Sequence, residues 1–359
     1  MKKNLLLNRL LVGACLFTNV LFFTSCDNET EQPKGTYESG VFVVNEGNFT
    51  KGNGAVSFIN TGSKIIETDI FKAVNGRPLG DNVQSMYIQQ EKAYVVVNNS
   101  NKIEVANANT FTSLATIENL KLPRYFTVAN NKGYVTETIS YTVANGQVSV
   151  IDLNTNTVIK VIPVGLQPEQ LVTLPNKVYV TNSGANTVSV INTATDAVEA
   201  TINVGDAPNS ITVDATGKIW VLCGGNTVYT SYPAFDETAS TAGSLVRINP
   251  NNNMVEASFS FATKGLSPAD LTINKEKNKL LYSYAGKVYQ FNIAATALPT
   301  TALINRSFYG LAVEPNTDII YGADAGAFTA NGKAFRYNAN GSAIDSFTTA
   351  VGPNGFVFK

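Results

Sequence analysis

The sequence of 359 residues contains no histidine. Histidine is the most common general base in enzymes and the usual partner of a serine or cysteine nucleophile, so this base is missing here. The sequence also has no calcium-binding loop of the DxDxDG type, although carboxylates could in principle hold an ion. We therefore expect a protein that is not an enzyme and that has no cofactor and no metal.

Cysteine and charged residues are scarce as well. Of the three cysteines, Cys15 and Cys26 lie near the N-terminus, which leaves Cys223 without a disulfide partner. A lone cysteine at the end of a strand is more often a small buried hydrophobe than a nucleophile. Charged residues make up 15% of the chain and the net charge is −1, which argues against a nucleic-acid partner, since that would require a basic surface.

The first residues have the pattern of a targeting segment. Lys2 and Lys3 precede the apolar run Leu10–Phe23, and Thr24-Ser25 then leads to Cys26. We expect residues 1–25 to be a lipoprotein signal peptide, Cys26 to be acylated, and residues 26–39 to be a tether. The membrane contact would then be the lipid anchor alone. An uncleaved membrane helix is the alternative, but the flank after Cys26 is acidic, whereas a stop-transfer helix has a basic one.

The rest of the chain, residues 40–359, repeats itself about every forty residues. The clearest unit is Lys177 to Asp214, in which four short stretches alternate β-branched or aromatic residues with polar ones and are separated by Asn, Gly, Asp and Pro. The first strand of the unit recurs seven times, with its large residue at Phe42, Tyr94, Tyr134, Tyr179, Trp220, Leu281 and Ile320. The pattern predicts an all-β, seven-bladed β-propeller of four-stranded antiparallel blades.

The ends of the repeat region predict how the ring closes. The region starts with a first-type strand, GVFVVN at Gly40–Asn45, and ends with a closing-type strand, NGFVFK at Asn354–Lys359. If these two strands pair, both ends of the region share one blade and the ring has no free edge. We also expect each closing-type strand to be the innermost strand of the next blade.

The repeat resembles a known family. YVTN at Tyr179–Asn182 and YVTE at Tyr134–Glu137 are similar to the signature of the YVTN propeller repeat found in surface-layer and YncE-like proteins. The acidic residues after Cys26 also resemble the surface-export signal of Bacteroidetes lipoproteins. This resemblance implies a propeller that is lipid-anchored in the outer membrane and exposed at the cell surface.

Long connections are unevenly distributed between the two faces of the predicted ring. In an up-and-down blade with strands A (innermost) to D, the A–B and C–D turns lie on one face, and here they are short. The long excursions all belong to B–C or D–A connections, which we expect on the other face: Asn45–Gly54, Lys72–Asn82, Thr138–Gly146, Gly224–Gly243 and Ala323–Gly332. These loops could merely cover the end of the ring, but together they suggest a recognition face.

We expect the ligand-binding residues on this face to be aromatic residues that offer flat surface and polar residues that offer hydrogen bonds. The candidates are Asn45, Asn82, Arg124, Tyr125, Glu137, Tyr141, Gln167, Asn182, Asn209, Tyr232, Phe235, Asp270, Tyr284, Phe308, Tyr309, Asp324 and Asn354.

Three functions are compatible with this pattern. The first is capture of a small-molecule nutrient for a TonB-dependent outer-membrane transporter. The resemblance implies cobalamin as a possible ligand, because vitamin B12-capturing surface propellers of gut Bacteroides have a similar anchor, leader and blade number. The second is a cell-surface scaffold that holds a protein or glycan. The third, and least favoured, is a lyase or lactonase that works through carboxylates and tyrosine.

Overall fold

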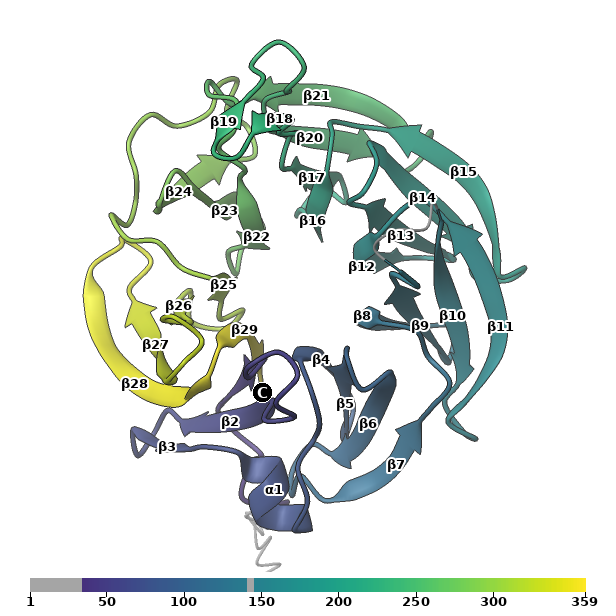
Figure 1. Ribbon diagram of the computed structural model, residues 1–359, viewed down its shortest axis with the longest axis vertical. Coiled ribbons are helices and arrows are strands. Elements are labelled where there is room, and N and C mark those ends of the chain that lie inside the picture. Colours follow the sequence, from purple (N-terminus) through teal and green to yellow (C-terminus); the bar gives the residue numbers. More distant parts are fainter. Residues whose placement is uncertain (1–33, 141–144) are drawn as a thin grey trace, which may run out of the picture. The chain divides into compact units, whose positions relative to one another are not determined.

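Seven small antiparallel sheets are arranged in a ring around a common axis (Figure 1). The computed structural model describes residues 34–140 and 145–359, so the predicted signal peptide and Cys26 lie outside the described residues. From inner to outer strand the blades are β29-β1-β2-β3, β4-β5-β6-β7, β8-β9-β10-β11, β12-β13-β14-β15, β16-β17-β20-β21, β22-β23-β24 and β25-β26-β27-β28. The predicted fold, a seven-bladed propeller, is confirmed.

The elements in chain order are β1 (Val41–Asn45), β2 (Ala55–Asn60), β3 (Ile65–Glu67), α1 (Ile70–Asn75), β4 (Val83–Gln89), β5 (Lys92–Val97), β6 (Lys102–Asn107), β7 (Ser113–Ile117), β8 (Pro123–Ala129), β9 (Lys132–Glu137), β10 (Gly146–Asp152), β11 (Thr157–Val164), β12 (Pro168–Leu174), β13 (Lys177–Asn182), β14 (Thr187–Asn192), β15 (Ala197–Asn203), β16 (Pro208–Val213), β17 (Ile219–Cys223), β18 (Tyr229–Ser231), β19 (Ala234–Phe235), β20 (Ser244–Asn249), β21 (Met254–Ser260), β22 (Ala269–Ile273), β23 (Lys279–Tyr284), β24 (Lys287–Asn292), β25 (Gly310–Val313), β26 (Ile320–Asp324), β27 (Asn331–Tyr337), β28 (Ala343–Val351) and β29 (Pro353–Phe358).

The core lies between neighbouring blades, because successive side chains of a strand point to opposite faces of its sheet. In β13, Val178 and Val180 pack into the cluster shared with the third blade, whereas Tyr179 between them packs into the cluster shared with the fifth blade. All three side chains are fully buried. Burial of each such side chain stabilises the fold by about 1.5–3 kcal/mol.

A recurring Asn or Asp at the end of the third strand forms the C–D turn. In β6, β10 and β14 the side-chain oxygens of Asn107, Asp152 and Asn192 each accept N–H groups from residues two and three positions further along. This Asx turn reverses the chain within a few residues. The A–B and C–D turns define what we call the turn face of the ring, and the B–C and D–A connections define the loop face.

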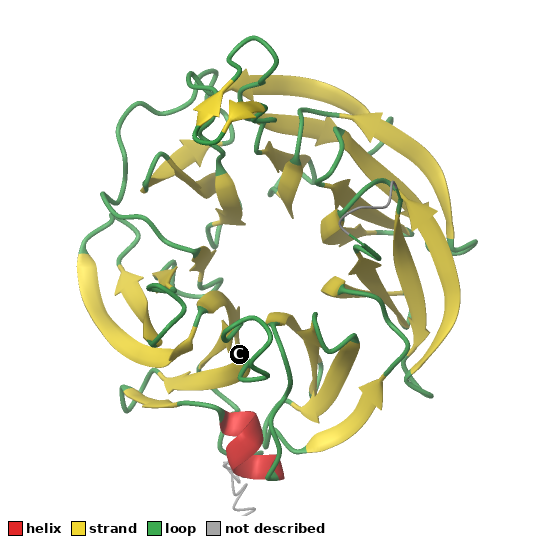
Figure 2. Cartoon of the chain, viewed as in Figure 1, coloured by secondary structure: helices red, strands yellow, loops and turns green. Residues whose placement is uncertain are grey.

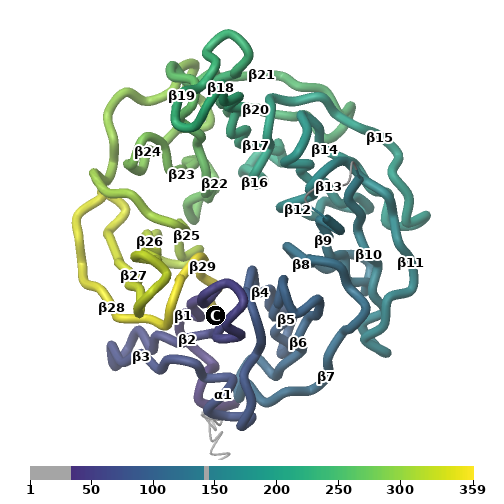
Figure 3. The backbone as a smooth tube through the Cα atoms, in the orientation of Figure 1, coloured from purple at the N-terminus to yellow at the C-terminus, as the bar shows by residue number. Residues whose placement is uncertain are grey.

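The two ends of the repeat region close the ring within one blade. β29 pairs antiparallel with β1, and the register joins Val41 to Phe358 and Val44 to Gly355. The C-terminal strand lies next to the N-terminal strands in Figure 3. Gly40 and Lys359 exchange backbone hydrogen bonds of 3.3 and 3.1 Å where β1 starts and β29 ends, which is on the turn face. The predicted closure by the last residues is therefore confirmed.

The sixth blade departs from the repeat. Its sheet has three strands, β22, β23 and β24, and the place of the outer strand is taken by residue Ile304, which forms an isolated bridge with Val288. The chain from Ile293 to Tyr309 has no other strand pairing among the described residues. The outer edge of this blade is consequently covered by an irregular segment.

A short helix, α1, lies at the outer edge of the ring between the first two blades (Figure 2). It starts after Asp69, whose carboxylate accepts the Lys72 N–H, and ends at Gly76, whose φ is 69°. Its Asn75 donates to the Phe111 carbonyl in the β6–β7 turn at 3.0 Å. That turn is on the turn face, so the expectation that all of Lys72–Asn82 is a loop-face excursion is wrong for its first half. Being only six residues long, the one helix in the described ranges is too short to cross a membrane.

Candidate functional site

Six of the seven inner strands begin on the loop face with a bend that turns two consecutive residues toward the ring axis. The residue before the strand has a positive φ in five blades: Asn82 (57°), Leu122 (46°), Gln167 (49°), Ala207 (52°) and Gly352 (66°). The strand pairing then shifts register in β4, β8, β12, β16, β22 and β29. Such a bulge turns two adjacent side chains to the same side.

These paired positions form what we call the inner rim. The first position of each pair is Gln84, Arg124, Glu169, Asn209, Ala269, Tyr309 and Asn354, and the second is Ser85, Tyr125, Gln170, Ser210, Asp270, Gly310 and Gly355. The core positions of the blades repeat in chemistry, but the rim positions do not. Because repeated residues maintain the fold, these non-repeating residues are the candidates for function.

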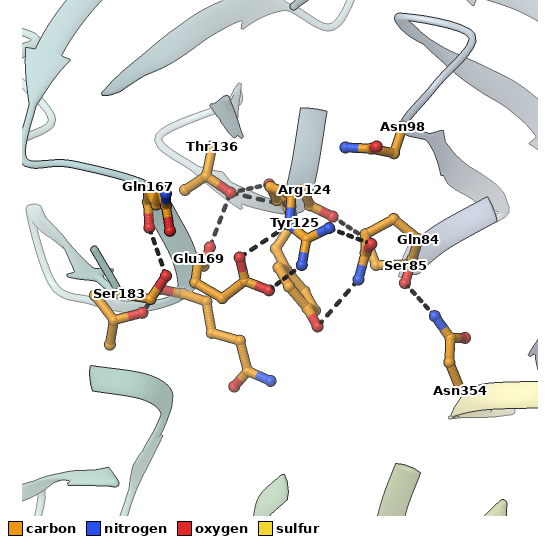
Figure 4. Close-up of polar contacts among 12 residues, drawn as sticks. Gln84, Ser85, Asn98, Arg124, Tyr125, Thr136, Gln167, Glu169, Ser183 and Asn354 are labelled. Atoms are coloured by element: carbon orange, nitrogen blue, oxygen red, sulfur yellow. Dashed lines mark hydrogen bonds and ion pairs between the residues drawn. The ribbon is translucent and has the colours of Figure 1, made fainter. Parts of the chain in front are cut away.

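A charged pair forms the centre of the inner rim. Arg124 binds Glu169 through two hydrogen bonds, with Nε to Oε2 at 2.9 Å and Nη2 to Oε1 at 2.5 Å. Its Nη1 also donates to Gln84 Oε1 at 2.5 Å. Figure 4 shows these three side chains pointing toward one another from neighbouring inner strands. Such two-point binding fixes the guanidinium plane and links the second, third and fourth blades.

The network continues to the blade where the ring closes. Asn354 in β29 donates to the Gln84 carbonyl at 2.9 Å and to Glu46 Oε1 at 3.0 Å. Tyr309, which precedes β25, donates from its hydroxyl to Glu46 Oε2 at 3.1 Å. Hydrogen bonds thus link Tyr309, Glu46, Asn354, Gln84, Arg124 and Glu169 in sequence across five of the seven blades.

Burial shifts the protonation of several rim groups. It raises the pKa of Glu46, although the hydrogen bonds from Asn354 and Tyr309 oppose that shift. Burial likewise raises the pKa of Tyr125 to about 12, and that of Asp270 to about 7. Because desolvation disfavours the charged form of a carboxyl group, Asp270 titrates close to neutral pH. A group that gains and loses a proton in this range is suited to pH-dependent binding or to proton transfer.

We expect Asp270→Asn to stabilise the protein more at high pH than at low pH. Between the ordinary pKa of an aspartate and about 7, folded Asp270 retains a proton that the unfolded chain has released, so stability falls as the pH rises through this window. Asn does not titrate, and it tolerates the φ of 59° at this position. Thermal unfolding at about pH 4 and about pH 8 measures the difference in melting temperature. The expectation is contradicted if the melting temperatures of the variant and the wild type differ by the same amount at both pH values.

Several predicted site residues lie on the inner rim. These are Arg124, Tyr125, Asn209, Asp270, Tyr309 and Asn354. Asn209 donates to the Pro268 carbonyl at 2.9 Å, which ties the fifth blade to the sixth. Asn82 and Gln167 are the left-handed residues that precede β4 and β12, so their backbone conformation helps to set the rim.

Three other predicted residues are fully buried inside their blades: Asn45, Glu137 and Asn182. Each bonds a serine on the neighbouring strand, Asn45 to Ser57 at 3.1 Å and Asn182 to Ser189 at 3.0 Å, and Glu137 accepts from Ser149. The structure therefore does not bring these side chains to the loop-face surface. They tie the second strand of a blade to the third.

The remaining predicted residues are separate from the rim network. Phe308 packs with Tyr337, Tyr284 packs on Phe261, and Asp324 pairs with Arg306 at 2.8 Å. Tyr232 and Phe235 belong to the β18–β19 hairpin, which lies at the outer edge of the ring in Figure 1, and Tyr232 is 86% exposed. Tyr141 lies outside the described residues.

Sequence reasoning did not identify Glu46, Gln84, Ser85, Glu169 and Gln170 as site residues. A signal for four of them existed, since the repeated closing strands, aligned on one another, start at the first rim position. Glu46 had no such signal, because it lies in the β1–β2 loop and joins the network only through Asn354 and Tyr309.

A cleft of about 480 Å³ lies on the opposite, turn face between the fourth and fifth blades. It is lined by Pro175, Tyr179, Lys218 and Pro250, among others. Both lysines beside it are paired with carboxylates, Lys177 with Glu199 at 2.7 Å and Lys218 with Glu256 at 2.9 Å. Within residues 34–140 and 145–359, no group of three or more acidic or cysteine side chains is placed to hold a metal ion.

Comparisons with known proteins place the chain among propellers. Residues 39–358 match the model of a protein family described as a domain of unknown function, DUF5074. No curated protein matches the chain. Among solved structures, a quinoprotein alcohol dehydrogenase-like protein from Bacteroides thetaiotaomicron is similar, with a TM-score of 0.65 and 13% identity over 90% of this chain and 79% of that one.

Two further similar structures are named for lactone hydrolysis. The periplasmic gluconolactonase of Pseudomonas aeruginosa has a TM-score of 0.63 and 13% identity over 89% of this chain and 99% of that one. A candidate 6-phosphogluconolactonase of Bacteroides fragilis has a TM-score of 0.60 and 13% identity over 90% and 99%. At this identity the likeness shows the fold alone.

The expectation that the protein is not an enzyme is wrong as an exclusion. It was based on the absence of histidine, but propellers similar to this one include a gluconolactonase. The absence of histidine therefore does not exclude catalysis on this fold.

Proposed function

We propose that this protein, which belongs to the DUF5074 family, binds a small polar ligand at the inner rim of its loop face. The observation that supports this proposal most directly is the network from Tyr309 to Glu169, in which side chains from five blades converge at one end of the ring axis. A convergence of polar groups held by a rigid scaffold is typical of ligand sites.

The finer proposal is capture of a nutrient at the cell surface. If Cys26 is acylated, the ring is anchored to the outer membrane and can pass its ligand to a TonB-dependent transporter. Cobalamin is the first candidate, since its corrin ring is flat and its edge bears amide groups. The inner rim offers both kinds of contact that such a molecule needs. The Tyr309 ring, in a residue that is 46% exposed, offers flat surface, and the neighbouring polar groups can form hydrogen bonds with the amides.

Gly355 allows a direct test of the site. A Cβ atom built on Gly355 meets no atom within 4 Å, and the residue does not have a positive φ, so a side chain can start there without backbone strain and extend into the open space at the rim. We expect Gly355→Tyr to fold normally and to weaken binding of cyanocobalamin by about tenfold or more, as measured by isothermal titration calorimetry.

The matched control is Gly62→Tyr. Gly62 lies in the β2–β3 turn of the same blade on the opposite face, where a Cβ atom meets only Asn60 Oδ1 at 3.4 Å. This variant should bind as the wild type does. Absence of cyanocobalamin binding at micromolar protein would discard cobalamin as the ligand. Binding that is unchanged in Gly355→Tyr would place the ligand elsewhere.

A lactone hydrolase is the second candidate function, and the observation that favours it is Asp270. A carboxyl group with a pKa near 7 is suited to act as a general base at neutral pH. Hydrolysis of glucono-1,5-lactone, followed by acid release in a pH-stat, tests this candidate. If activity survives in Asp270→Asn, Asp270 is not part of the mechanism. If the wild type hydrolyses the lactone no faster than buffer does, the lactone hydrolase function is rejected.

A further inference from the structure

Most hydrogen-bond donors of the inner rim are already used within the protein. Arg124 donates to Glu169 and Gln84, and both N–H groups of Asn354 are taken by Glu46 and the Gln84 carbonyl. Asn209 donates to Pro268 and Tyr309 to Glu46. A ligand at the rim would have to break one of these bonds to receive a hydrogen bond from the Asn354 amide or the Tyr309 hydroxyl.

Acceptor capacity, in contrast, remains at the same rim. An ionised carboxylate has two oxygens with about four lone-pair sites. Glu169 receives two hydrogen bonds from Arg124, and Glu46 receives its hydrogen bonds from Asn354 and Tyr309. Asp270 adds a third carboxyl group on the neighbouring sixth blade. The hydrogen-bonding capacity that remains unused at the rim is therefore mainly that of oxygen acceptors.

The charged groups of the rim are also mainly acidic. Three carboxyl groups, Glu46, Glu169 and Asp270, stand against one guanidinium, that of Arg124, which is already bound to Glu169. Among the ion pairs of the described ranges, neither Glu46 nor Asp270 takes part in one. At a pH above about 7, where Asp270 is ionised, a negatively charged ligand would lie next to two carboxylates, and the one guanidinium of the rim is already bound to Glu169. This arrangement is unfavourable at a partly desolvated site.

Open space at the rim lies over Gly355 in the first blade. The second rim position is glycine in the seventh and first blades, Gly310 and Gly355. At Gly310 a Cβ atom would meet the Asn354 carbonyl at 2.1 Å, so glycine is required there for the close approach of β25 to β29. At Gly355 a Cβ atom would meet nothing, so this glycine leaves open space. The strand β25 packs between β29, which carries Gly355, and β22, which carries Asp270. Glu46 is held at the closing blade by its hydrogen bonds from Asn354 and Tyr309.

We infer that the ligand lies in the sector over Gly355, has no net negative charge, and presents hydroxyl or amide N–H donors to the carboxyl groups of Glu46 and Asp270. This inference is built on the proposed function and specifies the chemical class of the ligand. It assigns Glu46 and Asp270 the role of selecting against anions, a role that the similar folds do not imply.

Pairs of compounds that differ by one carboxylate test this inference. Two suitable pairs are cyanocobalamin with its monocarboxylic acid, made by hydrolysis of one side-chain amide, and glucose with glucuronate. Calorimetric titration of the wild type should show the neutral member binding about tenfold or more tightly than the acid. In Glu46→Gln/Asp270→Asn this preference should shrink several-fold, since two carboxyl groups become neutral amides.

The outcomes separate the inference from the proposed function. An acid that binds the wild type as tightly as its neutral partner, and that loses binding in Gly355→Tyr, contradicts the inference but leaves the rim as the binding site. If no member of either pair binds, or if binding is unaffected by Gly355→Tyr, the proposed function fails and the inference with it. An unchanged preference in the folded double variant overturns the role of Glu46 and Asp270.

Discussion

Removal of residues 353–359 is expected to abolish the cooperative unfolding of the ring. These residues include β29 (Pro353–Phe358), the inner strand of the first blade, which pairs with β1 over its whole length. Phe356 packs into the cluster with the seventh blade, and Val357 packs against the cluster with the second blade. Without β29 the ring has two open ends and an unpaired inner strand edge, which is also prone to aggregation.

Circular dichroism during heating, together with size-exclusion chromatography, measures this effect. Asn354→Ala is the control, because it removes the rim hydrogen bonds to Glu46 and Gln84 but keeps the strand. We expect Asn354→Ala to unfold cooperatively, with a loss of about 1–3 kcal/mol from its unsatisfied partners. A monomeric, cooperatively melting truncated protein would show that β29 is dispensable for closure.

The second large effect is expected for Arg124→Met. The Arg124 and Glu169 side chains are only 19% and 14% exposed, so this substitution leaves a largely buried carboxylate without its cation. Breaking a buried ion pair in this way costs about 3–5 kcal/mol, and the remaining exposure places the expected loss at the lower end, about 3 kcal/mol. Urea denaturation followed by Tyr and Trp fluorescence gives the change in unfolding free energy.

The double variant Arg124→Met/Glu169→Met separates loss of the pair from burial of a lone charge. Because both charges are gone, we expect it to be more stable than Arg124→Met and close to the wild type. If the double variant loses as much stability as the two single variants together, the coupling energy between Arg124 and Glu169 is zero and the expectation is contradicted. In that case the unpaired, desolvated charge of Glu169 is not the cause of the lost stability.

Much of the fold could be predicted from the sequence, because its determinants are local and repeated. The period-two alternation in Lys177–Asn182 sends Tyr179 to one neighbouring blade and Val178 and Val180 to the other, which is what a ring of stacked sheets requires. The Asn or Asp that ends each third strand marks a C–D turn. The spare strands at the two ends predict closure, and β1–β29 pairing confirms it.

Departures from the repeat could not be predicted in this way. The helix α1 occupies the outer edge where most blades continue their fourth strand, because Ile70 and Phe71 are buried against Phe111 of the next blade. In the sixth blade, only the bridge between Val288 and Ile304 replaces a full outer strand. Both features depend on contacts between blades, which the alternation of a single strand does not encode.

The candidate site illustrates a second limit. Polar residues at equivalent positions of the B strands, such as Asn45 and Asn182, were expected to face a ligand, but they are buried and bond Ser57 and Ser189. The period of a strand indicates which residues share a face, yet it does not show whether a polar side chain finds a partner inside the sheet. The rim residues, in turn, reach the axis only because a bulge shifts the alternation at that point.

The chain enters the ring on the turn face. Tyr37 donates its N–H to the Asn109 carbonyl in the β6–β7 turn at 2.8 Å, and β1 then runs from that side toward Glu46. The leading residues thus join the ring at the end opposite to Arg124 and Tyr309. The entry of the chain at Tyr37 and the network of Glu46, Arg124 and Glu169 therefore lie at opposite ends of the ring axis, so a change to the residues around Tyr37 leaves the network untouched.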